Sequence, residues 1–438
     1  MALPSGVIGD TPAVTPPLPP AKVDPQSNGS SNGKPPAPDP IAAVPAVANP
    51  LSGGRAEFLL FSPPAVGEEE ILEIGHALRS GWISTGPRTK RFETEFGARI
   101  EAPGALALNS CTAGLHTALI VLGIGPGDEV ITTPMTFSAS VNVIEHVGAR
   151  PVLVDVEPDT LNIDPLAVEA ALTPRTKAIL AVHYSGHPAE LCALRDLAKT
   201  HGVALIEDAA HALPARYRGQ WIGSGDNPVA FSFYATKNLT TGEGGMLTGS
   251  PAFLERARVI SLHGMSRHAW LRYNRGSSWY YEIEAPGFKY NMSDLQAAMG
   301  LAQLRKLDGF QRRRREVVAA YNEAFAHVAC LEIPVERRHV EHAWQLYVLR
   351  LRSEALRIDR DRFIEELTAR NIGTSVHFIP IHLHPYYRNK YGYRPEDFPV
   401  AYGNFVRMLS LPLHPGLTDP DVGDVVEAVL DIVRRYRW

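Results

Sequence analysis

The chain has 438 residues, enough for two domains, and its 45% hydrophobic and 21% charged content is that of an ordinary soluble globular protein. Its formal net charge of -4 gives no general attraction to nucleic acid or to an anionic membrane, so any affinity for phosphate must come from a local site. The three cysteines are widely spaced and odd in number, which predicts a protein of the reducing cytoplasm. We expect no membrane span and no secretory signal, because the sequence lacks a run of about 18 apolar residues and does not start with a basic segment followed by an apolar one.

Residues 1–57 form a separate region by composition. They hold 13 of the 36 prolines, many Ala, Gly and Ser, and no aromatic residue. Such a segment cannot bury enough apolar surface to offset the entropy lost when a chain becomes ordered. We therefore expect a disordered tail, with a docking arm as the alternative.

From Phe58 the chain alternates short apolar runs with helical patterns. The predicted strands are 105–109, 128–134, 151–156, 178–184 and 204–208, and the predicted helices between them are 112–123, 137–148, 165–172 and 190–202. Alternation of this kind predicts an α/β fold with a mostly parallel sheet covered by helices on both faces. Ligands of such sheets bind beyond the carboxyl ends of the strands, so the residues after each strand are the candidates.

After about residue 300 the pattern changes. It predicts a long charged helix at 304–325, a strand at 342–351, a helix at 360–371 and a C-terminal helix from about Asp419. We expect a large α/β domain over 58–304 and a small α+β domain over 305–438.

Three strand ends carry candidate ligand groups. The first leads into NSCTAGLHTAL, where free N–H groups, the helix dipole and the Thr112 hydroxyl would suit a phosphate; a simple helix cap is the alternative. The second ends near Phe137, whose ring could cover a flat heteroaromatic ring or pack in the core. The fifth ends at Asp208, a carboxylate that needs a cationic partner or the N-terminus of a neighbouring helix.

Lys237 follows the apolar stretch VAFSFYA and precedes a glycine-rich turn. Burial lowers the pKa of a lysine and makes its amine nucleophilic enough to form a Schiff base with an aldehyde. A lysine, an aspartate for a pyridine nitrogen, an aromatic ring and a phosphate seat are the parts that pyridoxal 5'-phosphate (PLP) requires. Their order along one α/β sheet therefore predicts a PLP site.

A set of longer motifs carries a family resemblance: GWISTGPRTKRFE, NSCTAGLHTAL, TPMTFSASVN, VDVEPDTLNID, TPRTKAILAVHYSGHPAE, IEDAAHA, FSFYATKNLTTGEGGM, GFKYNMSDLQAA and SLPLHPGLT. From about Phe58 to the C-terminus the chain resembles the DegT/DnrJ/EryC1/StrS family of PLP-dependent nucleotide-sugar aminotransferases. The resemblance implies the PLP-dependent transferase fold type I, which is aspartate aminotransferase-like. The subgroup it looks closest to is the UDP-4-amino-4-deoxy-L-arabinose–oxoglutarate aminotransferase type, although that subgroup has Trp at the position of Phe137.

The resemblance implies roles at matching positions. Lys237 would bind the PLP aldehyde, Asp208 would pair with the ring nitrogen, and His211 would lie near the phenolic oxygen. Phe137 would stack on the ring. The residues implied at the cofactor phosphate are Thr112, Ala113 and Ser232, together with Asn291 of the neighbouring subunit in a homodimer.

The implied reaction is a ping-pong transamination in amino-sugar biosynthesis for a polysaccharide or lipopolysaccharide. L-glutamate would convert PLP to pyridoxamine phosphate, which would then aminate a nucleotide sugar, at C4 of a UDP-4-keto-sugar. Related enzymes that remove a hydroxyl carry His where this chain has Lys237, which favours transamination. The candidate sugar-nucleotide contacts are Ser84, Thr85, Gly86, Tyr184, His377, His382 and Tyr387.

Two other classes of function stay open. One is a non-catalytic regulator of the same fold that binds PLP or sugar, and the other is an aminotransferase for a C3 keto-sugar or a cyclitol. His382 and His384 form a pair without a third ligand, so no metal site is predicted. The arginines at 312–315 point in all directions on a helix, which favours a solvated or subunit-facing surface over nucleic-acid binding.

Overall fold

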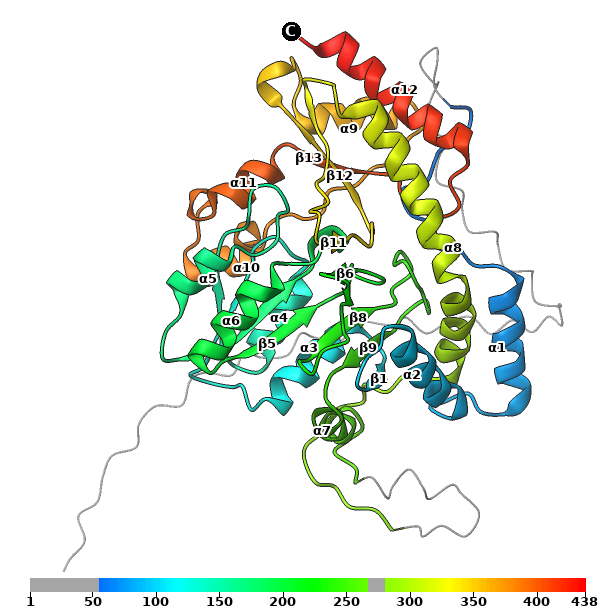
Figure 1. Ribbon diagram of the computed structural model, residues 1–438, viewed down its shortest axis with the longest axis vertical. Coiled ribbons are helices and arrows are strands. Elements are labelled where there is room, and N and C mark those ends of the chain that lie inside the picture. The colour runs from blue at the N-terminus through cyan, green and yellow to red at the C-terminus, as the bar shows by residue number, and fades with distance from the viewer. Residues whose placement is uncertain (1–54, 267–279) are drawn as a thin grey trace, which may run out of the picture. The chain divides into compact units, whose positions relative to one another are not determined.

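The computed structural model describes residues 55–266 and 280–438, all within one compact unit, Asn49–Trp438 (Figure 1). The predicted tail therefore lies outside the described residues as far as residue 54. The helices in chain order are α1 (Glu68–Ser80), α2 (Pro87–Arg99), α3 (Cys111–Val121), α4 (Ser138–His146), α5 (Pro165–Ala171), α6 (Leu191–His201), α7 (Pro251–Ser261), α8 (Asp294–Phe325), α9 (Arg360–Thr368), α10 (Pro385–Tyr391), α11 (Pro399–Phe405) and α12 (Asp419–Tyr436).

A seven-stranded sheet forms the centre of the fold, with strand order β1-β9-β8-β5-β4-β2-β3. Only β9 runs antiparallel to its neighbours in this sheet, and the rest are parallel, which confirms the predicted α/β class. The strands are β1 (Ala105–Leu108), β2 (Glu129–Thr132), β3 (Arg150–Leu153), β4 (Thr176–Val182), β5 (Ala204–Asp208), β8 (Val229–Ser232) and β9 (Gly245–Thr248).

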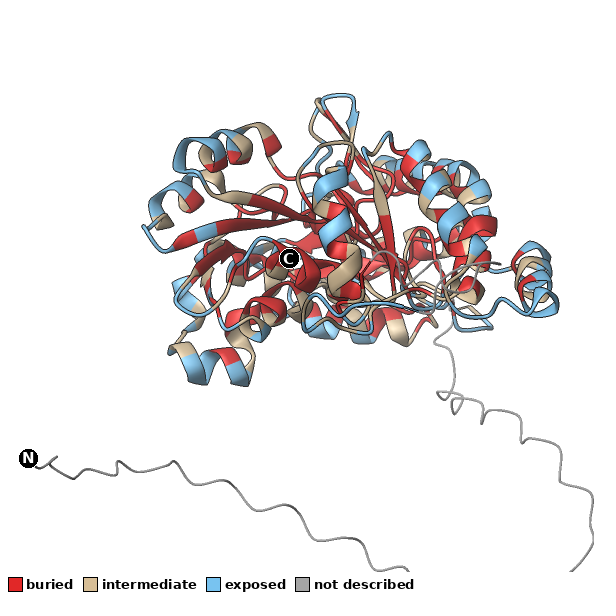
Figure 2. Ribbon diagram, turned by 90° about the horizontal axis from the view of Figure 1, so that it is seen from below, coloured by how far each residue is buried: buried red, intermediate tan, exposed pale blue. Residues whose placement is uncertain are grey.

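Helices cover both faces of this sheet, as its sequence pattern requires. Side chains alternate along each strand, so Ile179 of β4 packs in a cluster with residues of α2, α6 and α8, whereas its neighbour Leu180 packs with α3, α4 and α7. Figure 2 shows the buried strands between layers of helices that are exposed only on their outer sides. Two-sided burial explains why these strands are nearly continuous apolar runs.

A second, three-stranded sheet packs against the C-terminal helices. It is antiparallel, with order β10 (Leu331–Glu332), β12 (Tyr347–Leu351), β13 (Met408–Leu411), and shares a core with the end of α8, α9 and α12. A smaller sheet joins β6 (Arg216–Tyr217), β7 (Gln220–Trp221) and β11 (Val340–Glu341).

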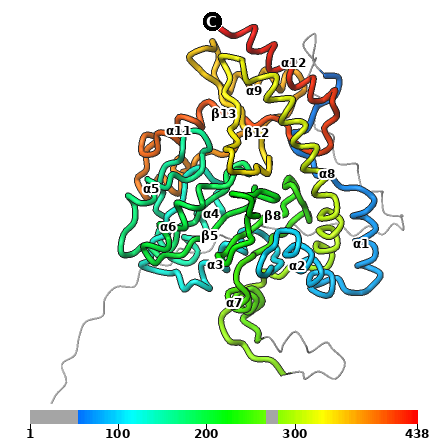
Figure 3. The backbone as a smooth tube through the Cα atoms, in the orientation of Figure 1, coloured from blue at the N-terminus to red at the C-terminus, as the bar shows by residue number. Residues whose placement is uncertain are grey.

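Helix α8 runs without a break from the large sheet to the sheet of β10, β12 and β13 (Figure 3). Its first half contacts α1 and α2, and its second half contacts α12. The expected division at residues 304 and 305 falls inside this helix, so the two-domain description stays a prediction. Among the described residues, every helix is too short or too polar to cross a membrane.

Candidate active site

Lys237 lies in the turn that follows β8. Its backbone N–H donates to Tyr234 O at 2.9 Å. The next residue, Asn238, is buried, and its side-chain amide donates to Leu213 O and to Ala343 O, each at 2.8 Å. The lysine side chain therefore starts from a backbone that is fixed on both sides.

The Lys237 amine has an altered proton affinity. The residue as a whole is half-buried, but its amine lies among protein atoms, and this burial lowers the pKa to about 8 against the opposing influence of Cys111 and Asp208. A lysine with such a pKa is partly unprotonated near neutral pH, and a free amine attacks a carbonyl carbon. A lowered pKa of Lys237 is what its position next to an apolar strand predicts.

Asp208, the last residue of β5, is buried and held by protein donors. The Ser140 hydroxyl donates to Oδ2 at 2.7 Å, and the Ala210 N–H donates to Oδ1 at 3.0 Å. Cys111 Sγ lies 3.8 Å from Oδ1, and burial raises the pKa of this thiol well above its usual value. The carboxylate is thus met by a hydroxyl, a backbone amide and a thiol, with the Lys237 amine nearby.

His211 and two aromatic rings lie on one side of this group. The His211 imidazole stacks on Phe378, whose ring centroid lies 6.0 Å from that of Phe137. Burial, and then the positive charge of Lys237, lower the pKa of His211 well below its usual value, so its imidazole is neutral. Phe137 is 63% exposed, which removes the alternative of a core residue and leaves a face open to a ligand. Phe378 is a residue that the sequence argument missed.

The predicted phosphate seat is the start of α3. Ser110 caps this helix, and its hydroxyl accepts from the Ala113 N–H at 3.1 Å. The Ala113 N–H is therefore already engaged, whereas the Thr112 side chain is half-buried at the same helix start. Ser232, half-buried at the end of β8, was also predicted here. The helix is thus capped by a serine, which was the alternative interpretation, and the phosphate seat at the start of α3 stays a prediction.

A glycine brings β9 close to this helix start. A Cβ atom at Gly245 would lie 2.5 Å from Cys111 N, a distance that no side chain could occupy. The glycine-rich stretch after Lys237 therefore serves close packing of backbones beside the predicted phosphate seat.

Ser84, Thr85 and Gly86 form a loop clamped to the segment that carries Asn291. The Asn291 amide donates to Thr85 Oγ1 at 2.6 Å, and the buried Asp294 carboxylate accepts from the Gly86 N–H at 2.8 Å. The structure thus brings these three loop residues and Asn291 together, beside the end of β1, where Asn291 pairs with Leu108.

Two of the predicted sugar contacts from later segments lie together and two lie apart. The Tyr184 hydroxyl donates to His377 O, and burial, together with the charge of Lys237, lowers the pKa of His377 to about 4. His382 is fully buried and contacts the ring of Phe398. Tyr387 is buried and its hydroxyl donates to Asn142. The contacts of His382 and Tyr387 are thus made outside the group around Lys237.

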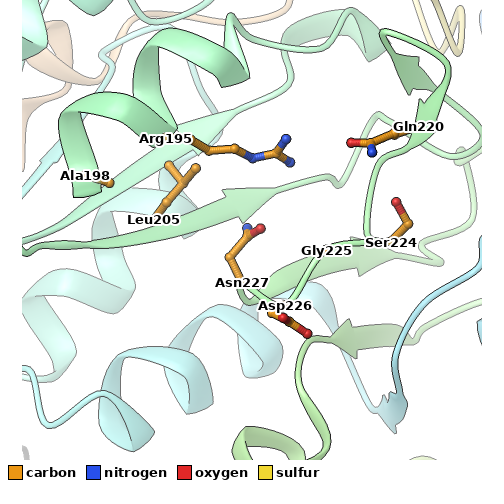
Figure 4. Close-up of a pocket in the computed structure, with 8 residues that line it drawn as sticks. All are labelled: Arg195, Ala198, Leu205, Gln220, Ser224, Gly225, Asp226 and Asn227. Atoms are coloured by element: carbon orange, nitrogen blue, oxygen red, sulfur yellow. The ribbon is translucent and has the colours of Figure 1, made fainter. Parts of the chain in front are cut away.

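A surface pocket of about 370 Å³ lies on the face of the large sheet that α6 covers (Figure 4). Its lining includes Arg195 of α6 and Asn227, which also contact Glu207 at 3.6 and 2.9 Å. Because side chains alternate along β5, Glu207 points toward α6, whereas Asp208 points toward α3. None of the predicted site residues lines this pocket, so it is separate from the candidate active site.

Comparison with known proteins identifies the chain at the level of its family. The model of the DegT/DnrJ/EryC1/StrS aminotransferase family matches residues 64–430. The chain belongs to this family. It is 52% identical over 382 residues to the spore coat polysaccharide biosynthesis protein SpsC of Bacillus subtilis (strain 168), a match that covers 87% of this chain and 98% of SpsC.

Solved structures agree with the family. Spr1654 from Streptococcus pneumoniae, in its PMP form, is 35% identical with a TM-score of 0.81, and the match covers 86% of this chain and 99% of Spr1654. A PLP form of the same protein matches with a TM-score of 0.79. The sugar aminotransferase CalS13 from Micromonospora echinospora is 30% identical with a TM-score of 0.77, over 85% of this chain and 99% of CalS13. The chain is therefore a PLP-dependent sugar aminotransferase of fold type I.

The residues around Lys237 fit this cofactor. The lysine supplies an amine that is partly unprotonated near neutral pH, and Asp208 supplies a carboxylate that can accept a hydrogen bond from a protonated pyridine nitrogen. The exposed face of Phe137 suits a flat ring, and the start of α3 suits a phosphate.

Proposed function

We propose that this aminotransferase moves the amino group of L-glutamate to a keto group of a nucleotide-activated sugar, at C4 of a UDP-4-keto-sugar, by a ping-pong mechanism. The observation that carries the transamination is the Lys237 amine, whose pKa burial lowers to about 8, beside the buried Asp208 carboxylate at the carboxyl rim of the sheet. The place of SpsC in spore coat polysaccharide biosynthesis supports an amino sugar destined for a surface polysaccharide.

Lys237 and Asp208 have distinct tasks in this proposal. Lys237 Nζ would hold the cofactor aldehyde, and its amine, once freed by an amino donor, would take up and return the proton at the donor Cα. Asp208 accepts the hydrogen bond of the protonated ring nitrogen. PLP, when bound, takes up the electron pair released at the donor Cα. His211, which is neutral, provides a hydrogen-bonding group near the phenolic oxygen.

The remaining cofactor contacts come from both subunits of a homodimer. Phe137 covers the ring, and the phosphate is bound by Thr112 and Ser232, with Ala113 contributing if its bond to Ser110 opens. Asn291 of the partner subunit completes the phosphate site. Since Asn291 contacts Thr85, the same segment brings the loop of Ser84, Thr85 and Gly86 to the sugar nucleotide.

The sugar side of the site includes Tyr184 and His377, which are linked by a hydrogen bond. His382 and Tyr387 remain predicted contacts, although their side chains pack elsewhere in this structure. The cytoplasmic location also remains a prediction.

Of two alternatives, membership of the aminotransferase family argues against the first, a regulator of the same fold that binds PLP or sugar without turnover. The second is an enzyme for a C3 keto-sugar or a cyclitol. The absorbance of the PLP-loaded protein separates the first from an enzyme. We expect the visible PLP band to bleach on addition of glutamate and to return on addition of a keto-sugar, whereas a regulator would show neither change.

A panel of UDP-, GDP- and dTDP-keto-sugars, with the aminated product identified by mass and NMR, tests the finer proposal. We expect amination at C4 of a UDP-sugar. Amination of a C3 keto-sugar or a cyclitol alone would replace that proposal with the second alternative.

A further inference from the structure

A chain of buried hydroxyl groups ends on Asp208. Thr136 Oγ1 lies 2.7 Å from Ser140 Oγ, and Ser140 Oγ lies 2.7 Å from Asp208 Oδ2. Thr136 is 2% exposed and Ser140 is fully buried, so water does not compete for these bonds. The chain begins just after β2 and reaches the end of β5 through the first turn of α4.

The direction of the protons along this chain follows from chemistry. An ionised carboxylate only accepts hydrogen bonds, so the single Ser140 proton is donated to Asp208. The Ser140 oxygen must then accept from Thr136, which makes Thr136 the donor of the first bond. Each hydroxyl therefore has one orientation, and the two bonds reinforce each other.

The Asp208 carboxylate has room for one further donor. A carboxylate offers about four acceptor positions. Two are used, by Ser140 at 2.7 Å and by the Ala210 N–H at 3.0 Å. Cys111 Sγ lies 3.8 Å from Oδ1, but its one proton has a nearer acceptor in Ala230 O at 3.4 Å. The titratable groups that face it are Cys111, from α3, and Lys237, after β8. A free acceptor position on this carboxylate suits a single N–H donor.

We propose that Ser140, oriented by Thr136, is a positioning residue that aims the Asp208 carboxylate at the ring nitrogen of PLP. The inference rests on the role proposed for Asp208. It also links two features of the cofactor site, because Phe137, which covers the ring, lies between Thr136 and Ser140 in the chain. The segment 136–140 would then both cover one face of the PLP ring, through Phe137, and orient the carboxylate that binds the ring nitrogen, through Thr136 and Ser140.

The test uses the full chain with and without PLP. The variants are S140A and T136V, with D208N as the reference and S138A as the matched control on the same helix turn. Ser138 is half-buried and has no part in the chain of hydroxyl groups. The two readouts are the dissociation constant of PLP from the apo-protein and the pH midpoint of the absorbance change of bound PLP. The second readout reports on the proton of the linkage between Lys237 and PLP, which responds to the charge held at the ring nitrogen, and it would not move if Ser140 only stabilised the fold.

For S140A we expect PLP to bind about tenfold more weakly, the effect of losing one hydrogen bond to a charged group. We also expect its absorbance midpoint to shift in the same direction as that of D208N, by less. T136V keeps the Ser140 hydroxyl and should give a smaller shift of the same sign, and it provides the answer if S140A does not fold. S138A should match the wild type.

Two results would overturn the inference in distinguishable ways. If D208N shifts the midpoint but S140A and T136V match the wild type in both readouts, Ser140 does not position Asp208 and the proposed role of Asp208 stands. If D208N itself leaves the midpoint unchanged, the proposed role of Asp208 fails, and the inference about Ser140 fails with it.

Discussion

The imidazole of His211 lies nearly parallel to the ring of Phe378, with centroids 5.7 Å apart and an interplanar angle of 19°. The two residues come from distant parts of the chain, and the contact keeps water from the imidazole. Removing the Phe378 ring should therefore change the proton affinity of His211 without adding or removing a polar group.

For F378A we expect the pKa of His211 to rise toward the ordinary value of about 6.5, because burial is the main cause of its lowering. NMR titration of the imidazole signals in the apo-protein measures this shift. F61A is the matched control, since Phe61 stacks on His377 with centroids 5.4 Å apart. That variant should raise the pKa of His377 from about 4 instead. If the pKa of His211 is unchanged in F378A, the Phe378 ring does not contribute to the burial that lowers this pKa.

Lys237 should reduce the stability of the apo-protein at neutral pH. Its pKa is lowered from 10.5 to about 8, so between these values the unfolded chain binds a proton that the folded amine has released. Stability therefore rises with pH across this window, and below it the buried ammonium penalises the folded state. We expect K237M to be more stable than the wild type by about 1–2 kcal/mol at pH 7, with the difference narrowing toward pH 10.

Urea unfolding of the two apo-proteins at several pH values measures this difference. K199M is the control, because Lys199 is exposed on α6 and its replacement should leave the free energy of unfolding nearly unchanged. A K237M protein that is less stable than the wild type at pH 7 would show that the amine is not penalised by burial.

Gly245 should be needed for cofactor affinity. In G245A the new Cβ would lie 2.5 Å from Cys111 N, so β9 or the start of α3 must move. Because that helix start is the proposed phosphate seat, we expect PLP to bind at least about tenfold more weakly. Fluorescence titration of the apo-protein with PLP measures the affinity.

The matched control is G423A in α12. An added Cβ there meets nothing within 4 Å, and Ala suits a helix better than Gly. Unchanged PLP affinity in G245A would show that the close approach of these backbones has no part in cofactor binding.

Asp294 should hold the predicted sugar loop. Its buried carboxylate accepts from the N–H groups of Gly86, Arg88 and Thr89 at 2.8, 3.0 and 2.9 Å, and so caps α2. We expect D294A to lower the free energy of unfolding by about 2–4 kcal/mol, since these donors lose their acceptor. If the loop contacts the sugar, KM for the sugar nucleotide should rise more than KM for glutamate.

Steady-state kinetics with each substrate varied in turn separates the two effects. D308A on the same helix is the control, because Asp308 is 77% exposed and its ion pair with Arg99 should contribute less than about 1 kcal/mol. Equal changes in both KM values for D294A would argue against a sugar contact by this loop.

Much of the fold follows from patterns within short segments. The strands predicted at 105–109 and 204–208 are observed as β1, which ends at Leu108, and β5, because two-sided burial requires apolar runs there. The long helix was predicted to begin at 304, but α8 begins at Asp294. The pair Ser293 and Gln296 forms a capping box, which is the sequence signal that marks this start.

The groups that support the site could not be predicted in the same way. Phe378 reaches His211 only because the C-terminal part of the chain folds back over the rim of the sheet, and no periodicity in the sequence records that contact. Ser140 lies in a helical pattern in which a serine is unremarkable, and its role depends on the end of β5 lying beside it. Lys237 and Asp208 could be proposed from the sequence because an ionisable side chain next to a buried apolar strand is costly unless a partner or a ligand compensates for it.

Covalent attachment of PLP to Lys237 is tested most directly by borohydride reduction of the PLP-loaded protein, followed by proteolysis and mass spectrometry. We predict a single pyridoxyl group, on the peptide that contains Lys237, and none after the same treatment of K237M. A pyridoxyl group on another lysine, or on no lysine, would contradict the assignment of the active site.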